Sequence, residues 1–263
     1  MVNTLRRAAW NAGQIMECLS VEALGTINNL EARFSRAKFR PRQDEASLTL
    51  ATQRLCDVAT AGIAEFFGTA EATMLADRGW NFCRLGQQFE RASITCNAGS
   101  TIFRSIARRL EKSPGVPDHA IEIELSAFLR MLGSRDIYRR VYQMRAEPVP
   151  VLNLLYNHED TPKSVHRCLR ECALLLGEEH DDAPGTVKTR DALERVLELI
   201  AAADWNTCLK ASASAPSEAG GGVQLDPART AWLVDSLDEI MERTHAIHDV
   251  ITDGFINHQI LLD

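Results

Sequence analysis

The chain has 263 residues, of which 45% are hydrophobic and 25% are charged, and this composition is typical of a globular protein with one large or two small hydrophobic cores. Its 36 acidic and 29 basic residues give a formal net charge of -7, which argues against a general affinity for nucleic acid or for anionic membranes. No apolar stretch approaches the roughly 18 residues that span a bilayer, and the N-terminal residues lack the apolar core of a signal peptide, so we expect a cytoplasmic protein.

Apolar residues spaced three and four positions apart predict helices along the first half of the chain. The expected helices lie at about 3–19, 20–38, 44–67 and 71–110. Pro41 separates the second helix from the third, and Gly68 is expected to separate the third from the fourth. A turn at 113–117, with two prolines and a glycine, follows the fourth helix.

The same spacing continues in the second half, where we expect helices at about 118–132, 136–142, 161–176, 186–208 and 226–255, with a short apolar segment at 151–156. Thr161 as N-cap and Pro162 at the first helical position open one of these helices. A segment rich in Ser, Ala and Gly, about 211–223, is expected to be a flexible loop. No stretch alternates with a period of two, so the predicted fold is all-α: a single domain over 1–263, a bundle of long antiparallel helices without a β-sheet.

The cysteines form an odd set of seven, without a CxxC pair and without the spacing of a zinc site. Each lies in an apolar helical context, so we expect small core residues that stay reduced. They are Cys18, Cys56, Cys83, Cys96, Cys168, Cys172 and Cys208.

The fourth expected helix carries an acidic residue, Glu90, on a side that is otherwise apolar. The favoured interpretation is a buried ion pair between Glu90 and an arginine of a neighbouring helix, with Gly79 and Gly86 allowing the close approach. In a second interpretation, Glu90 accepts a ligand amine or guanidinium in a groove floored by Gly79, Cys83 and Gly86. A third makes Glu90 the acid or base of an enzyme.

The opposite side of this helix carries Asp77, Arg84 and Arg91, with Trp80 one turn before Arg84. Arginines beside a tryptophan can form a cation-π and anion-binding surface, although such a row is more often a solvated face. We include these four residues and Glu90 among the candidate binding residues.

Two further segments carry candidate binding residues. Tyr138, Arg139 and Arg140 combine aromatic and guanidinium groups, which suits a phosphate or an acidic partner surface; alternatively the tyrosine packs and the arginines pair with acidic neighbours. Ser164 is expected to cap its helix, where backbone N–H groups can also receive an anion, and Arg167 follows in the same turn.

A di-metal bundle would need two Glu-x-x-His pairs, and the sequence has one, Glu242 with His245, with His248 one turn further on. Because the second pair is missing, we expect no metal, and we expect no other cofactor. The motifs GxGxxG, Walker A, Gly-x-Ser-x-Gly and His-Glu-x-x-His are absent from the sequence. Without a phosphate loop, the chain is not expected to bind and hydrolyse ATP by itself.

The stretch TMLADRGWNFCRLGQQFERA resembles the signature of the bacterial alpha-E family, helical proteins named for a Glu-Arg motif. The resemblance extends to LGSRDIYRRVY and to DTPKSVHRCLRE, and covers Asn3 to about Leu176. Family members resemble a tandem of two related halves, and here the first half lacks its own Glu-Arg helix. The resemblance therefore implies a truncated tandem, a degraded first copy or a shortened relative. Gln87 and Ser93 depart from the family's usual Arg and Asp and remove charge near Glu90.

The resemblance implies partners, because the family is commonly encoded beside circularly permuted ATP-grasp proteins and transglutaminase-like proteins. We therefore predict a non-catalytic helical accessory protein of an ATP-grasp-type peptide or amide ligase system. The alternatives are a stand-alone enzyme that uses Glu90 as acid or base and, less favoured, a di-metal carboxylate bundle. Self-association is also expected, since a half-missing tandem leaves an apolar helix face uncovered.

Overall fold

The computed structural model describes residues 2–36, 44–112, 118–177, 184–208, 225–226 and 229–256. Within these ranges the regular structure is helical, with no β-strand, so the all-α prediction is confirmed. The chain divides into two compact units, Met1–Trp80 and Asn81–Asp263. The sequence patterns, which treat 1–263 as one domain, carry no sign of this boundary, and the expected loop at 211–223 lies outside the described residues.

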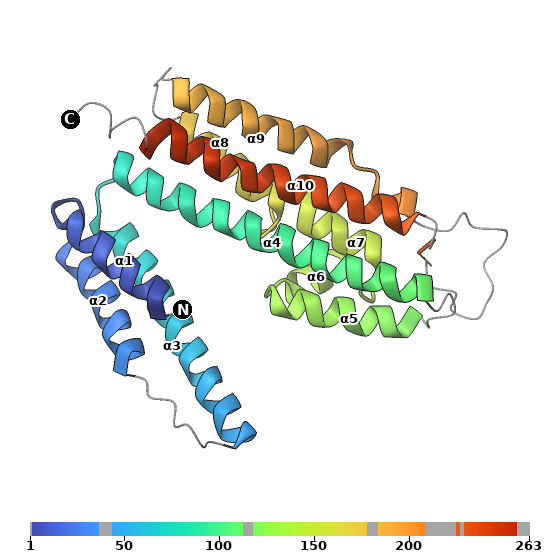
Figure 1. Cartoon of the computed structure of the whole chain (residues 1–263), viewed down its shortest axis with the longest axis horizontal. Coiled ribbons are helices and arrows are strands. Elements are labelled where there is room, and N and C mark those ends of the chain that lie inside the picture. Colours follow the sequence, from blue (N-terminus) through green and yellow to red (C-terminus); the bar gives the residue numbers. More distant parts are fainter. Residues whose placement is uncertain are drawn as a thin grey trace. The chain divides into compact units, whose positions relative to one another are not determined.

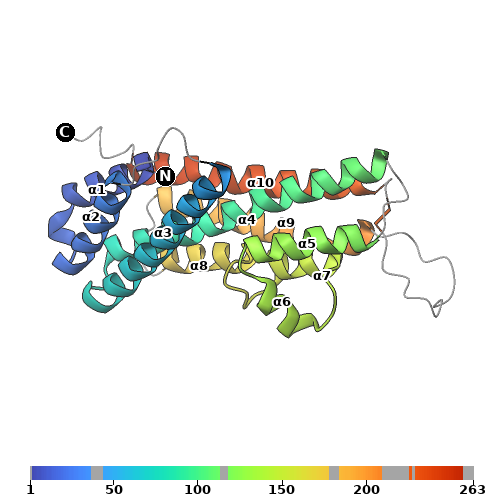
Figure 2. The same cartoon turned by 90° about the horizontal axis from the view of Figure 1, so that it is seen from below.

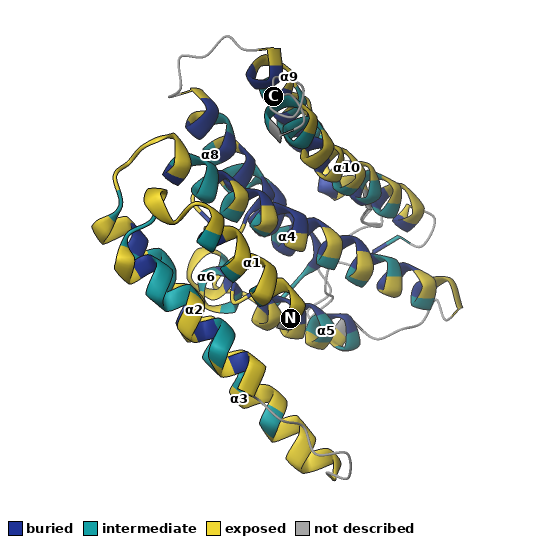
Figure 3. Cartoon of the chain, turned by 60° about the vertical axis from the view of Figure 1, so that its left-hand side comes forward, coloured by how far each residue is buried: buried dark blue, intermediate teal, exposed yellow. Residues whose placement is uncertain are grey.

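The first unit is a small helical bundle made of α1 (Val2–Gln14), the short helix η1 (Met16–Cys18), α2 (Val21–Arg36) and α3 (Glu45–Thr73). Helix α2 packs against both α1 and α3. The buried hydrophobic cluster comprises Leu30, Phe34 and Ala59, with Gly62 of α3 lying against the Leu30 side chain. Figure 3 shows that much of α3 is exposed. This core is therefore small.

The boundary between α3 and α4 (Arg78–Lys112) differs from the prediction. Helix α3 continues through Gly68 to Thr73, because a glycine inside a helix costs only about 1 kcal/mol relative to alanine. The helix stops before Asp77, whose Oδ1 accepts the backbone N–H of Trp80 at 3.0 Å. Capping by Asp77, rather than the glycine, therefore sets the start of α4.

The second unit comprises most of α4 and the helices that follow it. These are α5 (Asp118–Met131), α6 (Arg135–Tyr142), α7 (Pro148–Leu152), η2 (Asn153–Asn157), α8 (Val165–Gly177), α9 (Pro184–Ala202), η3 (Trp205–Cys208), α10 (Thr230–Ile251) and η4 (Thr252–Ile256). Figures 1 and 2 show α10 running beside α4 and α9, antiparallel to both. None of the described helices is both long enough and apolar enough to cross a lipid bilayer.

The centre of the second unit is the apolar segment that the sequence analysis places at 151–156. It forms the end of α7 and the π-helical turn η2, and the Tyr156 ring is fully buried. The Tyr156 ring lies 5.6 Å from that of Trp205, whose Nε1–H donates to Asn157 Oδ1 at 2.6 Å. Gly99 of α4 lies directly under Tyr156, and a Cβ at that position would overlap the phenol oxygen. The close approach that we expected at Gly79 and Gly86 therefore occurs at Gly99.

The cysteines divide between the core and the surface. The thiols of Cys96, Cys168 and Cys172 are buried, as expected, and burial raises the pKa of Cys96 to about 12, that of Cys168 to about 11 and that of Cys172 to about 12. Cys83 is half-buried, and the Cys208 side chain lies outside the described residues. For Cys18 and Cys56 the expectation is wrong, because both lie in the first unit, whose few helices leave broad faces exposed.

Candidate functional site between helices α4 and α10

Polar contacts in the second half of α4 fix the register of α4 against α10. Arg104 Nη2 lies 2.5 Å from Asp238 Oδ2, and the Ser100 hydroxyl donates to the same carboxylate. Cys96 Sγ lies 3.9 Å from Thr244 Oγ1 in the buried seam between the helices. These contacts hold the two helices together along several turns.

Two contacts of α4 residues with histidines of α10 border a groove. Asn97 Nδ2 lies 3.0 Å from His245 Nε2. The Phe89 ring stacks on the His248 ring, with 6.2 Å between centroids and 22° between planes. Between these contacts α4 and α10 enclose an open groove of about 630 Å³.

The groove is lined by carboxylates from both helices, and the lining residues that the structure describes include no lysine or arginine. Glu90 comes from α4, and Glu242 and Asp249 come from α10. None of the three carboxylates forms an ion pair or a hydrogen bond with a residue that the structure describes. Ser93 also lines the groove, and its buried hydroxyl has no partner among the same residues.

Glu90 is exposed, so the favoured prediction of a buried ion pair is wrong. Gly86 and Glu90 belong to one outward row of α4 that continues through Ile94 and Asn97. A Cβ on Gly86 would meet no atom within 4 Å, and one on Gly79 would meet only Asp77 Oδ1, at 3.3 Å. The two glycines therefore do not floor a groove, and Glu90 belongs instead to the groove against α10.

The inward row of α4 runs through Leu85, Phe89, Ala92 and Cys96. Ile94 is apolar but 52% exposed, so counting it as a core residue places the apolar face of α4 on the wrong side of the helix. The interpretation of Glu90 as a partly buried acid or base loses its premise, since the carboxylate stands in solvent.

Arg91 follows Glu90 but lies on a different side of the helix. Arg91 is half-buried. Burial raises the pKa of the Cys168 thiol on α8, and the positive charges of Arg91 and Arg167 partly offset that rise. The Glu-Arg pair thus faces two environments: the open groove for the carboxylate and the α8 side for the guanidinium.

A family described as "a predicted alpha-helical domain with a conserved ER motif" matches residues 1–256. The chain belongs to the Alpha-E family. No curated protein and no solved structure matches the chain.

The structure of this Alpha-E chain does not favour the cation-π surface that was one of the two interpretations of Trp80, Arg84 and Arg91. Trp80 is buried in the first unit, where its ring centroid lies 6.3 Å from that of Phe67. It is therefore not the exposed aromatic ring that a cation-π surface with Arg84 and Arg91 needs. Asp77 serves as the cap of α4.

On α6 the aromatic and guanidinium groups separate. The Tyr138 hydroxyl donates to the Arg145 carbonyl at 2.6 Å and accepts the Glu147 N–H at 3.2 Å. Burial raises the pKa of Tyr138 to about 12. Arg139 and Arg140 are exposed and form no ion pair with the described part of the chain. Tyr138 is thus a core residue, and the two arginines remain open to an anionic partner.

At the start of α8, Ser164 and Arg167 hold the preceding loop. The Ser164 hydroxyl accepts the Arg167 backbone N–H at 3.1 Å and donates to the His158 carbonyl at 2.5 Å, which confirms Ser164 as a cap of this helix. The helix begins at Val165, so the expected start with Thr161 as N-cap and Pro162 at the first helical position is wrong. Arg167 Nη1 donates to the Asp160 carbonyl at 2.6 Å. Both side chains therefore have structural partners.

The structure does not unite the sequence-predicted residues in one site. Those on α6 and those on α8 do not line the α4–α10 groove, and of the α4 set only Glu90 does. The groove instead adds Ser93, Asn97 and Asp249, together with the three α10 residues considered above for a metal. Glu242, His245, His248 and Asp249 follow an i, i+3, i+6, i+7 spacing, which places them on one face of a helix. This spacing is the sequence signal from which the α10 side of the groove could have been predicted. Across the described ranges, no three His, Cys, Asp or Glu side chains are grouped as metal ligands would be.

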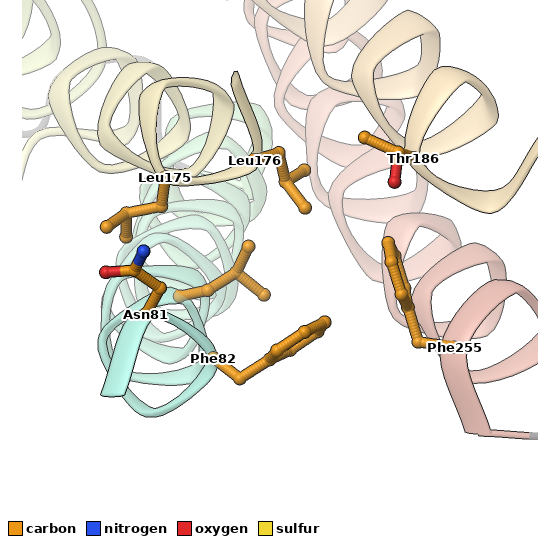
Figure 4. A pocket seen from close by; sticks show the side chains of 7 residues that line it. Asn81, Phe82, Leu175, Leu176, Thr186 and Phe255 are labelled. Carbon is orange, nitrogen blue, oxygen red and sulfur yellow. The ribbon is translucent and has the colours of Figure 1, made fainter. Parts of the chain in front are cut away.

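Two apolar hollows adjoin α4. One, of about 590 Å³, lies between α4 and α5 and is lined by Ile94, Asn97 and Met131 among others. Ile94 and Asn97 also line the α4–α10 groove, so this hollow and the groove adjoin each other at α4. The other is shown in Figure 4, where the half-buried Phe82 and Phe255 line it. Their ring centroids lie 5.1 Å apart, edge to face.

Proposed function

We propose that this Alpha-E chain is a non-catalytic helical interaction protein that docks on an ATP-grasp-type peptide or amide ligase. The observation that carries the proposal is the pair of adjoining hollows on α4, one acidic and one apolar. Large apolar side chains stand exposed at the apolar hollow, with Ile94 at 52% and Met131 at 68%. Contiguous exposed apolar surface beside polar groups is typical of a protein-protein contact site.

The choice of partner rests on the family resemblance. Alpha-E proteins are commonly encoded beside circularly permuted ATP-grasp proteins, and this sequence has no phosphate loop of its own. A division of labour follows, in which the ligase supplies the ATP chemistry and the helical chain supplies a docking surface. A transglutaminase-like protein is the second partner that the same resemblance suggests.

The test is co-expression with the neighbouring ligase, followed by titration calorimetry of the purified proteins. Ile94→Gln removes an apolar contact from the proposed surface. Leu174→Gln is the matched control, because Leu174 is 53% exposed on α8 and lines neither hollow. We expect the ligase to co-purify with the wild-type chain, and we expect Ile94→Gln to weaken binding about tenfold while Leu174→Gln has little effect.

Thermal melting of both variants checks that the fold is unchanged. The proposal fails if no complex forms at micromolar concentration and the turnover of the ligase is the same with and without the chain. It also fails if the two variants weaken binding equally, because the effect would then not belong to the α4 surface.

A further inference from the structure

The α4–α10 groove is rich in hydrogen-bond acceptors, and no lysine or arginine is among the described residues that line it. Glu90 stands on one wall, and Glu242 and Asp249 stand on the other. Two other carboxylates of α10 have arginine partners: Asp238 pairs with Arg104, and Glu239 pairs with Arg243. The three groove carboxylates have no such partner within the described ranges, so the groove lacks its complementary charge.

Ser93 gives a second and independent sign of a ligand. Its side chain is only 7% exposed, yet its hydroxyl finds no hydrogen-bond partner among the described residues. Helical serines commonly satisfy the hydroxyl by donating to the carbonyl four residues earlier. The Ser93 hydroxyl has no such partner, although Ser93 is one of the residues that line the groove.

Asn97 adds a further acceptor. With Asn97 Nδ2 donating to His245 Nε2, the amide oxygen Oδ1 remains available to a ligand. At the other end, the exposed His248 ring, which stacks on the buried Phe89 ring, offers an aromatic face. The groove therefore combines several acceptors and an aromatic face, and this combination suits a planar cation with many donors.

We propose that the α4–α10 groove binds a guanidinium group. A guanidinium is planar, carries five N–H donors and is weakly hydrated, so it can donate to carboxylates on both walls and to the Ser93 and Asn97 oxygens. A small guanidinium compound or an arginine side chain of a partner protein provides this same group. In the second case the inference rests on the proposed docking function, and the arginine belongs to the ligase.

The experiment is an NMR titration of the intact chain with ethylguanidinium chloride in buffer containing EDTA. The imidazole signals of His245 and His248 report on the groove, and His158, which does not line it, is the internal control. Tetraethylammonium chloride is the control ligand, because it carries the same charge without N–H donors. We expect saturable shifts of the two groove histidines with ethylguanidinium only.

Three variants localise the binding. Glu90→Gln keeps the shape and removes one charge, and should weaken ethylguanidinium binding about threefold. Glu198→Gln, on an exposed position of α9, is the matched control and should bind as the wild type does. Ser93→Ala should weaken binding about fivefold while leaving the urea midpoint unchanged or higher, because it removes an unsatisfied hydroxyl.

Linear, non-saturating shifts would overturn the proposal, as would equal shifts with tetraethylammonium or unchanged affinity in Glu90→Gln. Calorimetry with the ligase separates the two sources. Loss of ligase affinity in Glu90→Gln assigns the guanidinium to a partner arginine. Ethylguanidinium binding without any ligase binding supports a small-molecule site and rejects the docking function alone.

Discussion

Tyr138 shows how a single buried hydroxyl can hold a chain segment that has no regular structure. Its oxygen accepts the N–H of Glu147 and donates to the carbonyl of Arg145, so it satisfies two backbone groups between α6 and α7. Leaving such groups unpaired in a buried position costs about 1–3 kcal/mol. The role of Tyr138 is therefore structural, although the sequence pattern equally suits a ligand site.

We predict that Tyr138→Phe lowers the free energy of unfolding by about 1–3 kcal/mol, because it removes both hydrogen bonds and keeps the ring. Tyr142→Phe is the matched control. The Tyr142 ring lies 5.1 Å from that of Tyr138, but its hydroxyl has no hydrogen-bond partner among the described residues, so the change should stay within about 0.5 kcal/mol. Urea denaturation followed by circular dichroism measures both. Equal effects of the two substitutions would contradict the assignment.

At the scale of helices, the glycines of α4 separate a close contact from open surface. A Cβ at Gly99 would overlap the Tyr156 hydroxyl, whereas a Cβ at Gly86 would meet nothing within 4 Å. Both glycines lie inside α4 and have the same intrinsic helix propensity, so they differ only in the atoms that surround them. They therefore form an internal comparison for the packing of η2 on α4.

We predict that Gly99→Ala destabilises the protein by about 1–3 kcal/mol, because the added methyl group would force the fully buried Tyr156 ring to shift within the core. Gly86→Ala should instead stabilise it by up to about 1 kcal/mol, since alanine favours the helix. Urea midpoints of the two variants test both signs. If Gly86→Ala destabilised the protein, another part of the chain would have to lie close to Gly86, as the sequence suggests, and the structure would be contradicted.

The helices could be predicted from sequence because apolar spacing is a local signal, whereas the contact between α4 and α10 could not. Local spacing predicts that α4 is amphipathic but does not specify which helix covers each face. Ile94 illustrates the ambiguity, since an exposed apolar residue shifts the projected face and places Glu90 on the wrong side. The groove arises from residues about 150 positions apart in the chain, as in the contact of Asn97 with His245, and no local pattern encodes that pairing.

At the scale of the whole molecule, the two compact units have cores of very different size. The cluster in the first unit consists of Leu30, Phe34 and Ala59, supported by partly buried neighbours. The second unit has an extensive cluster that draws on α4 to α10 and includes Leu237 and Trp205. Since burial of apolar surface supplies most of the driving force for folding, the first unit should be the less stable of the two.

We predict that the two units respond separately to a core truncation. Leu30→Ala should lower the stability of the first unit by about 2–4 kcal/mol, and Leu237→Ala should do the same to the second. Hydrogen exchange with mass spectrometry at increasing urea distinguishes peptides of α2 and α3 from peptides of α8 to α10. In Leu30→Ala only the first group should lose protection at lower urea than in the wild type, and in Leu237→Ala the second group should. If either substitution moves both groups of peptides together, the chain unfolds as one cooperative unit, and its division into two compact units has no energetic counterpart.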